Sequence, residues 1–142
     1  TVMRANYERL QQIVWRESVG GPVMERPLAN DSIVLVQLTD GQLKCLNTED
    51  GSVLWESSIR EGQTALTIGR QYAYYQNSGG GLTAVRLSDG HIAARVDHAF
   101  ADGLRNPYSD RVYLRARDGR IMCLHEIAAV APQFTKAVEV MR

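Results

Sequence analysis

Three histidines are the side chains of this sequence best suited to bind a metal ion or to act as general bases. Neither the step from His91 to His98 nor the step from His98 to His125 matches a compact metal-ligand motif. We therefore interpret them as solvated turn residues. The glycine run at residues 79–81 resembles a phosphate loop only in part, because no lysine follows it. The sequence contains no Gly-x-Ser-x-Gly nucleophile motif.

Four aspartates are candidates for acid–base catalysis by paired carboxylates. Each directly precedes a glycine, and they are Asp40, Asp50, Asp89 and Asp118. Aspartate before glycine is typical of tight turns, because the carboxylate accepts hydrogen bonds from nearby backbone N–H groups and glycine adopts a positive φ readily. Turn chemistry accounts for these residues, so the next question is which elements the turns connect.

The turns belong to a repeat of constant period, and the step from Leu43 to Leu82 equals the step from Leu82 to Ile121. The glycines of the turns follow the same period: Gly41, Gly80 and Gly119 in one turn, and Gly51 and Gly90 in the next. Three copies in register, without an insertion, indicate a repeat architecture.

Apolar and polar residues alternate with a period of two within each unit, which is typical of β-strands. In the first unit the runs cover residues 33–38, 43–46 and 53–56, and a weaker run at 22–28 precedes them. Four short antiparallel strands per unit predict the blade of a β-propeller. We expect an all-β fold in a single domain over residues 1–142, with about three four-stranded blades. The expected blades span residues 19–58, 59–98 and 99–126.

Residues 40–55 resemble the repeat of pyrroloquinoline-quinone-type propellers, in which an Asp-Gly turn, an apolar strand, a Gly turn and a final Trp recur. The resemblance extends over about residues 12–125 and implies a propeller fold. It also implies that Trp15 and Trp55 pack between adjacent blades. The second copy has Ala93, Ala94 and Arg95 where the Trp would stand.

Quinone-dependent dehydrogenases of this type use an adjacent cysteine pair, calcium-binding acids and a catalytic aspartate. We find no such set of residues here, so the resemblance implies the fold and no cofactor. Cys45 and Cys123 are two periods apart and therefore occupy equivalent positions on the first and third blades. A whole blade between them excludes a disulfide, whose Cα atoms must lie within about 7 Å. We interpret both as small buried hydrophobic residues.

The two ends of the repeat array differ. Residues 12–18 resemble the strand that contains Trp55, so we interpret them as the outer strand of a preceding blade. The third copy has no convincing outer strand, and residues 127–142 are interpreted as a capping segment or a linker. A ring needs four to eight blades. Either the chain is a fragment of a longer propeller, or two copies form a homodimer that closes a six-blade ring.

Two groups of side chains are candidates for a partner-binding surface. Tyr72, Tyr74 and Tyr75 form the densest aromatic group, and at least one of them is expected to present a contact surface. On the third blade Arg111, Arg115 and Arg117 share one strand parity and would form an exposed basic stripe suited to an acidic partner.

Charge and composition narrow the function classes. With 16 basic and 16 acidic residues, the sequence lacks the positive charge of a nucleic-acid binder, and it contains no apolar run long enough to span a membrane. We predict a non-catalytic protein-interaction or scaffold module with a protein partner. Similar propellers include periplasmic and outer-membrane assembly scaffolds, which implies an extracytoplasmic location. The alternatives are a fragment of a quinone-dependent dehydrogenase-like enzyme or of a sensor ectodomain.

Overall fold

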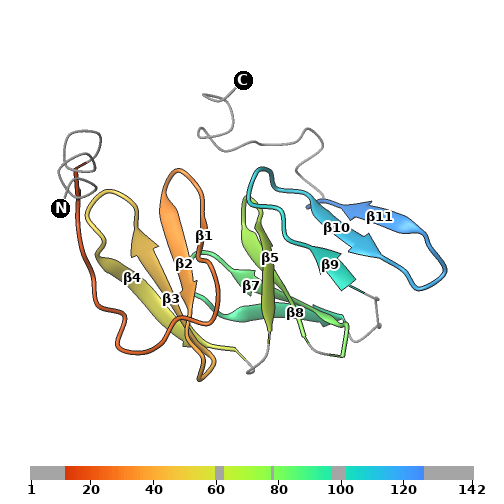
Figure 1. Ribbon diagram of the computed structural model, residues 1–142, viewed down its shortest axis with the longest axis horizontal. Helices are drawn as coiled ribbons and strands as arrows, with labels where there is room; N and C mark the ends of the chain where they lie inside the picture. Colours follow the sequence, from red (N-terminus) through yellow and green to blue (C-terminus); the bar gives the residue numbers. More distant parts are fainter. Residues whose placement is uncertain (1–11, 60–62, 78, 97–101, 127–142) are drawn as a thin grey trace, which may run out of the picture.

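The computed structural model describes residues 12–59, 63–77, 79–96 and 102–126. Within these ranges the chain is all-β and contains no helix. The strands form three antiparallel sheets that follow one another along the chain and lie side by side (Figure 1). The all-β fold and its antiparallel blades are thus confirmed.

The first two sheets have four strands each, paired in chain order. The first consists of β1 (Leu28–Ala29), β2 (Ile33–Gln37), β3 (Gln42–Asn47) and β4 (Val53–Ser58). The second consists of β5 (Thr64–Ile68), β6 (Tyr72–Gln76), β7 (Leu82–Arg86) and β8 (Ile92–Val96). Each is an up-and-down meander, because every connection joins neighbouring strands. A bridge between Val23 and Leu38 lies beside β1 and continues the pairing of the first sheet.

The two four-stranded sheets repeat in detail. Cys45 on β3 pairs with Trp55 on β4, and Ala84 on β7 pairs with Ala94 on β8. A register shift follows each pair, after Cys45 and after Ala84, so even the irregularity of the strands recurs after one period. The predicted turn glycines all have a positive φ: 88° at Gly41, 76° at Gly51, 91° at Gly80, 78° at Gly90 and 92° at Gly119.

The third sheet has three strands in the described part of the chain, in the order β11-β10-β9. These are β9 (Asp102–Leu104), β10 (Val112–Arg115) and β11 (Ile121–Leu124). In the first two sheets the fourth strand, β4 or β8, forms the outer edge. In the described part of the third sheet β11 forms this edge instead. The strands of the three sheets span residues 28–58, 64–96 and 102–124, and the expected blade bounds stay a prediction. The capping segment or linker expected at residues 127–142 lies outside the described residues.

Residues 12–18 are not part of a strand in this structure. Their interpretation as the outer strand of a preceding blade stays a prediction. They nevertheless contribute to packing, because Trp15, together with Val19 just after the segment, lies against a cluster of Val36, Leu38 and Leu46 on the first sheet.

The apolar core lies between the sheets. Nine buried residues fill the seam between the first and second sheets: Leu28, Leu35, Leu43, Cys45, Ile59, Ala65, Ala73, Tyr75 and Val85. A smaller cluster lies in the seam between the second and third sheets: Leu66, Leu82, Val112 and Leu114. Strand alternation therefore buries one face of a blade against the next blade.

Candidate functional site

Trp55 connects the first blade to the second. Its indole Nε1 donates a hydrogen bond to the carbonyl oxygen of Leu87 at 2.7 Å, and the ring covers the turn at Gly90. A Cβ atom on residue 90 would collide with that ring. Beside it, the hydroxyl of Ser57 donates to the carbonyl oxygen of Gly90 at 2.6 Å. A large aromatic side chain thus lies on the one residue of the turn that has no side chain, Gly90.

Trp15 makes the same contact one blade earlier. Its Nε1 donates to the carbonyl oxygen of Thr48 at 2.8 Å, and its ring covers Gly51. Thr48 and Leu87, like Gly51 and Gly90, are one period apart. The structure therefore places Trp55 between adjacent blades, as the family resemblance implies. Trp15 makes the equivalent contact with the first blade, and its place between two blades stays a prediction.

Two buried glutamines, which the sequence reasoning missed, also join neighbouring blades. Gln37 Nε2 donates to the carbonyl oxygen of Gln63 at 2.9 Å, and Gln76 Oε1 accepts from the N–H of Gly103 at 2.6 Å. Gln37 and Gln76 are 4% and 8% exposed and are one period apart. That spacing is the signal that could have identified them.

On the third blade, some residues that correspond to buried residues of the first two blades are exposed. Ile121 is 69% exposed, although its counterparts Leu82 and Leu43 are 7% and 0% exposed. Arg115 stands at the position of the two glutamines. We define the open face as Tyr113, Arg115, Ile121 and Cys123, the third-blade residues at positions that face a following blade in the first two copies.

Cys123 corrects one expectation. It is exposed, whereas Cys45 is buried, so only the first of the two is a small core residue. The difference arises because the burial of Cys45 depends on the second blade, and no described residue provides such a neighbour for Cys123. Burial raises the pKa of the Cys45 thiol to about 11.

The predicted basic stripe is also corrected. Arg111 is 6% exposed and lies one residue before β10, so strand parity does not apply to it. Arg115 and Arg117 are not buried, as expected. Arg115 forms two hydrogen bonds with Asp102 on the neighbouring strand β9, at 3.0 and 2.8 Å, and this pairing lowers the pKa of Asp102.

Of the three tyrosines, Tyr75 is 1% exposed and belongs to the core, so it presents no contact surface. The Tyr75 side chain lies in the seam between the first and second sheets. Tyr72 and Tyr74 are partly buried. The Tyr74 hydroxyl lies 3.3 Å from Oε1 of Glu126, and burial, followed by this carboxylate, raises the pKa of Tyr74.

Glu126 fastens the end of the third blade to the second. Its carboxylate accepts hydrogen bonds from the backbone N–H groups of Gln71 and Tyr72 at 3.2 Å, in addition to its contact with Tyr74. Tyr74 and Tyr75 therefore contribute to the seams between blades, and a contact surface at Tyr72 stays a prediction.

The aspartates of the turns behave as turn residues. Each accepts a hydrogen bond from the backbone N–H two residues later: Gln42 for Asp40, Ser52 for Asp50, His91 for Asp89, and Arg120 for Asp118. His91 and His125 are exposed, and His98 lies outside the described residues. The described ranges contain no group of three or more potential metal ligands, and no helix in them could span a membrane.

Comparison with known proteins identifies the family. The family described as "Outer membrane protein assembly factor BamB", a PQQ-type repeat family, matches residues 11–139. The chain belongs to this family. BamB from Yersinia pestis is 26% identical over 87 residues, which are 57% of this chain and 22% of that protein. BamB from Shewanella oneidensis is 25% identical over 111 residues, which are 75% of this chain and 27% of that protein. The chain thus spans 22% and 27% of these two relatives.

Solved structures agree with this fold. BamB from Moraxella catarrhalis matches with a TM-score of 0.60 at 16% identity, over 84% of this chain and 39% of that one. The β-propeller domain of Cps50 (Swd1) from Myceliophteria thermophila matches with a TM-score of 0.56 at 14% identity, over 87% and 44% of the two chains. Both likenesses show that the three sheets are propeller blades.

Proposed function

We propose that this chain is part of a non-catalytic scaffold that binds proteins through its blade faces and takes part in outer-membrane protein assembly, as its relatives are named to do. The observation that carries the proposal is the exposure of Ile121 at a position that is buried in both other blades. An exposed apolar residue among Tyr113, Arg115 and Cys123 favours contact with another protein surface.

The location proposed for this activity is the periplasmic side of the cell envelope. The relatives are named for outer-membrane protein assembly, which supports this location. Fractionation of a Gram-negative bacterium that produces the full-length protein tests it, and recovery in the cytoplasmic fraction alone would contradict it.

Introduction of a charge at the open face tests the docking role. The variant Ile121→Asp should weaken the binding of another protein surface to the open face. The introduced carboxylate would have to lose its hydration when the apolar contact forms. The control Leu54→Asp changes a 51% exposed residue of β4 in the same way, away from the open face. Equal association of both variants and the unmodified chain would count against the open face as the contact surface.

A second candidate is a homodimer, and one specific observation favours it. Among the described residues, β11 has a free edge, while residues 12–18 lie outside any strand and carry Trp15 at the place of an outer-strand tryptophan. If this segment adds to β11 of a second copy, two three-blade arcs close a six-blade ring.

The repeat register provides a test of the homodimer. Lys44 pairs with Glu56 in the first blade, and the corresponding residues in the dimer are Met122 of one copy and Arg16 of the other. The double variant Arg16→Cys/Met122→Cys, made in a Cys123→Ser background, should form a disulfide between chains on mild oxidation. Each single variant is a control. Cross-linking no greater than in the single variants would reject this register.

The enzyme alternative is tested by adding pyrroloquinoline quinone and Ca²⁺ to the full chain. A scaffold should show no change in Tm and no new absorbance. A clear rise in Tm together with new absorbance would favour a quinone-dependent enzyme instead.

A further inference from the structure

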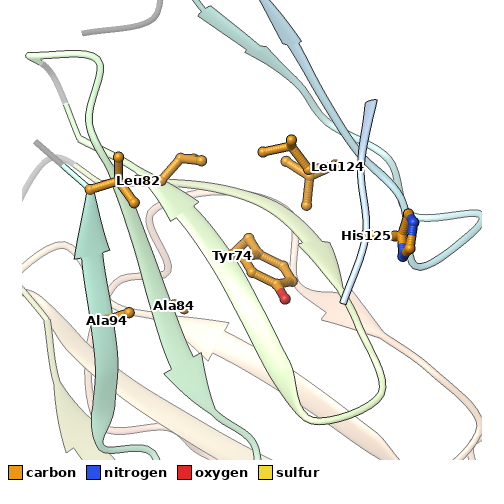
Figure 2. A pocket seen from close by; sticks show the side chains of 8 residues that line it. Tyr74, Leu82, Ala84, Ala94, Leu124 and His125 are labelled. Atoms are coloured by element: carbon orange, nitrogen blue, oxygen red, sulfur yellow. The ribbon is translucent and has the colours of Figure 1, made fainter. Parts of the chain in front are cut away.

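A cavity of about 300 Å³ lies between the second and third blades. Figure 2 shows Tyr74, Leu82, Ala84 and Ala94 on the side of the second blade, and Leu124 and His125 opposite them. Val96 and Val112 complete the lining. The walls are therefore mostly aliphatic, and one tyrosine and one histidine complete them.

The lining of this cavity corresponds, residue by residue, to a seam that is filled elsewhere in the molecule. A shift of one period toward the N-terminus gives Leu35, Leu43, Cys45, Trp55, Ser57, Ala73, Val85 and Arg86. Six of these eight lie in or against the packed core between the first and second blades. The cavity in the seam between the second and third blades thus occupies the place that a packed core occupies in the seam between the first and second blades.

The difference between the two seams is the loss of an indole ring. Ala94 stands at the position of Trp55, and each pairs with the equivalent residue of the strand beside it. Trp55 covers the turn at Gly90, whereas the methyl group of Ala94 is too small to fill the corresponding volume, and no other side chain of the described residues fills it. The larger Tyr74, which replaces Leu35, does not fill it, because its hydroxyl is directed to Glu126.

The polar groups at the margin of the cavity already have partners. The Tyr74 hydroxyl contacts the Glu126 carboxylate, and His125 Nδ1 lies 2.6 Å from the carbonyl oxygen of Glu126. Apolar cavities of this kind bind flat hydrocarbon molecules, and one of about 150 Å³ is large enough for benzene. The chemistry of the walls thus favours an uncharged, largely apolar ligand.

We propose that this cavity is a binding site for a free, neutral aromatic molecule of about the size of indole. The seam between the first and second blades holds the indole ring of Trp55 at the equivalent place, and the ring of Trp15 makes the matching contact with the first blade. The site is separate from the open face of the third blade, so its occupancy does not depend on the proposed scaffold role.

Thermal unfolding of the full chain with free indole tests the proposal. A saturating concentration should raise the Tm by about 3 °C, because indole binds the folded state alone. The variant Ala94→Trp should abolish this rise, since its own side chain fills the cavity. The control Arg95→Trp places the same ring on the opposite face of β8, because Ala94 and Arg95 are successive residues in regular register with Ala84 and Thr83, and it should leave the rise intact.

Three results would overturn the proposal. One is the absence of a rise in Tm with indole in the unmodified chain, as expected if another part of the chain occupies the cavity. Another is an equal rise in the Ala94→Trp variant, which would place the ligand elsewhere. The third is a larger rise with the tripeptide Gly-Trp-Gly than with free indole, because it would assign the site to a protein side chain.

Discussion

Gly90 lies directly beneath the indole ring of Trp55, with a φ of 78° and no room for a Cβ atom. The same relationship joins Gly51 to Trp15. The ring of Trp55 comes from the first blade and the ring of Trp15 from the segment that precedes it, and each lies on a turn glycine of the blade that follows in the chain. The seam between blades therefore depends on a glycine and a tryptophan that lie far apart in the sequence.

The variant Gly90→Ala should destabilise the chain by about 2–3 kcal/mol, because it combines backbone strain at positive φ with a collision against Trp55. Gly119→Ala is the matched control. Gly119 has a φ of 92°, and no described atom lies within 4 Å of its added Cβ, so backbone strain of about 1 kcal/mol is the expected cost. Urea unfolding measures both. Equal losses would show that the Trp55 contact contributes nothing.

Removal of the ring itself should cost about 3 kcal/mol in Trp55→Ala, because a large aromatic contact and a hydrogen bond to Leu87 are lost together. The neighbouring variant Leu54→Ala alters a side chain that is 51% exposed and should change stability by less than about 1 kcal/mol. If Trp55→Ala and Leu54→Ala unfold at the same urea concentration, the contact of Trp55 with the second blade does not stabilise the chain.

The two thiols should differ in reactivity with a disulfide reagent at pH 8. Cys123 is exposed and should react at once, while Cys45 is buried with a pKa of about 11 and should react only on unfolding. One thiol per chain is expected to react rapidly with the reagent, and this rapid reaction should be absent in Cys123→Ser. Two rapidly reacting thiols in the folded chain would mean that the first seam opens readily.

Asp89 should titrate below the ordinary value of 3.8, because the Arg86 guanidinium and then the N–H of His91 hold its charged form by hydrogen bonds. Its pKa is lower in the folded than in the unfolded state. The stabilisation is therefore present above pH 3.8 and is lost as the pH falls through the folded pKa. NMR titration of the carboxyl carbon measures this. Arg86→Gln should raise the pKa of Asp89, and an unchanged value would assign the effect to another group.

The turn positions can be predicted from the sequence because they are local. An Asp-Gly pair between alternating strands specifies its own backbone geometry, and the period of the repeat reproduces it, so the positive φ expected at Gly41, Gly51 and Gly90 is confirmed. The Trp15 and Trp55 contacts follow from the same period together with the family resemblance.

Burial cannot be predicted in the same way, because it depends on the neighbouring blade and not on the strand. Cys45 and Cys123 are equivalent in sequence, yet only the first has a described blade packed over it. Strand parity fails for Arg111 because this residue precedes β10. The cavity beside Ala94 appears only when the two seams are compared in space.

The central claim is that the third-blade face around Ile121 docks a protein surface, here that of a second copy of the chain, and the solution mass of the full chain tests it most directly. Light scattering after size exclusion, over a range of concentrations, should give a mass above 15.8 kDa, with twice that value for ring closure. The mass should fall to 15.8 kDa in Ile121→Asp while the β-sheet signal persists. A clean, folded monomer of the unmodified chain at every concentration would contradict the claim.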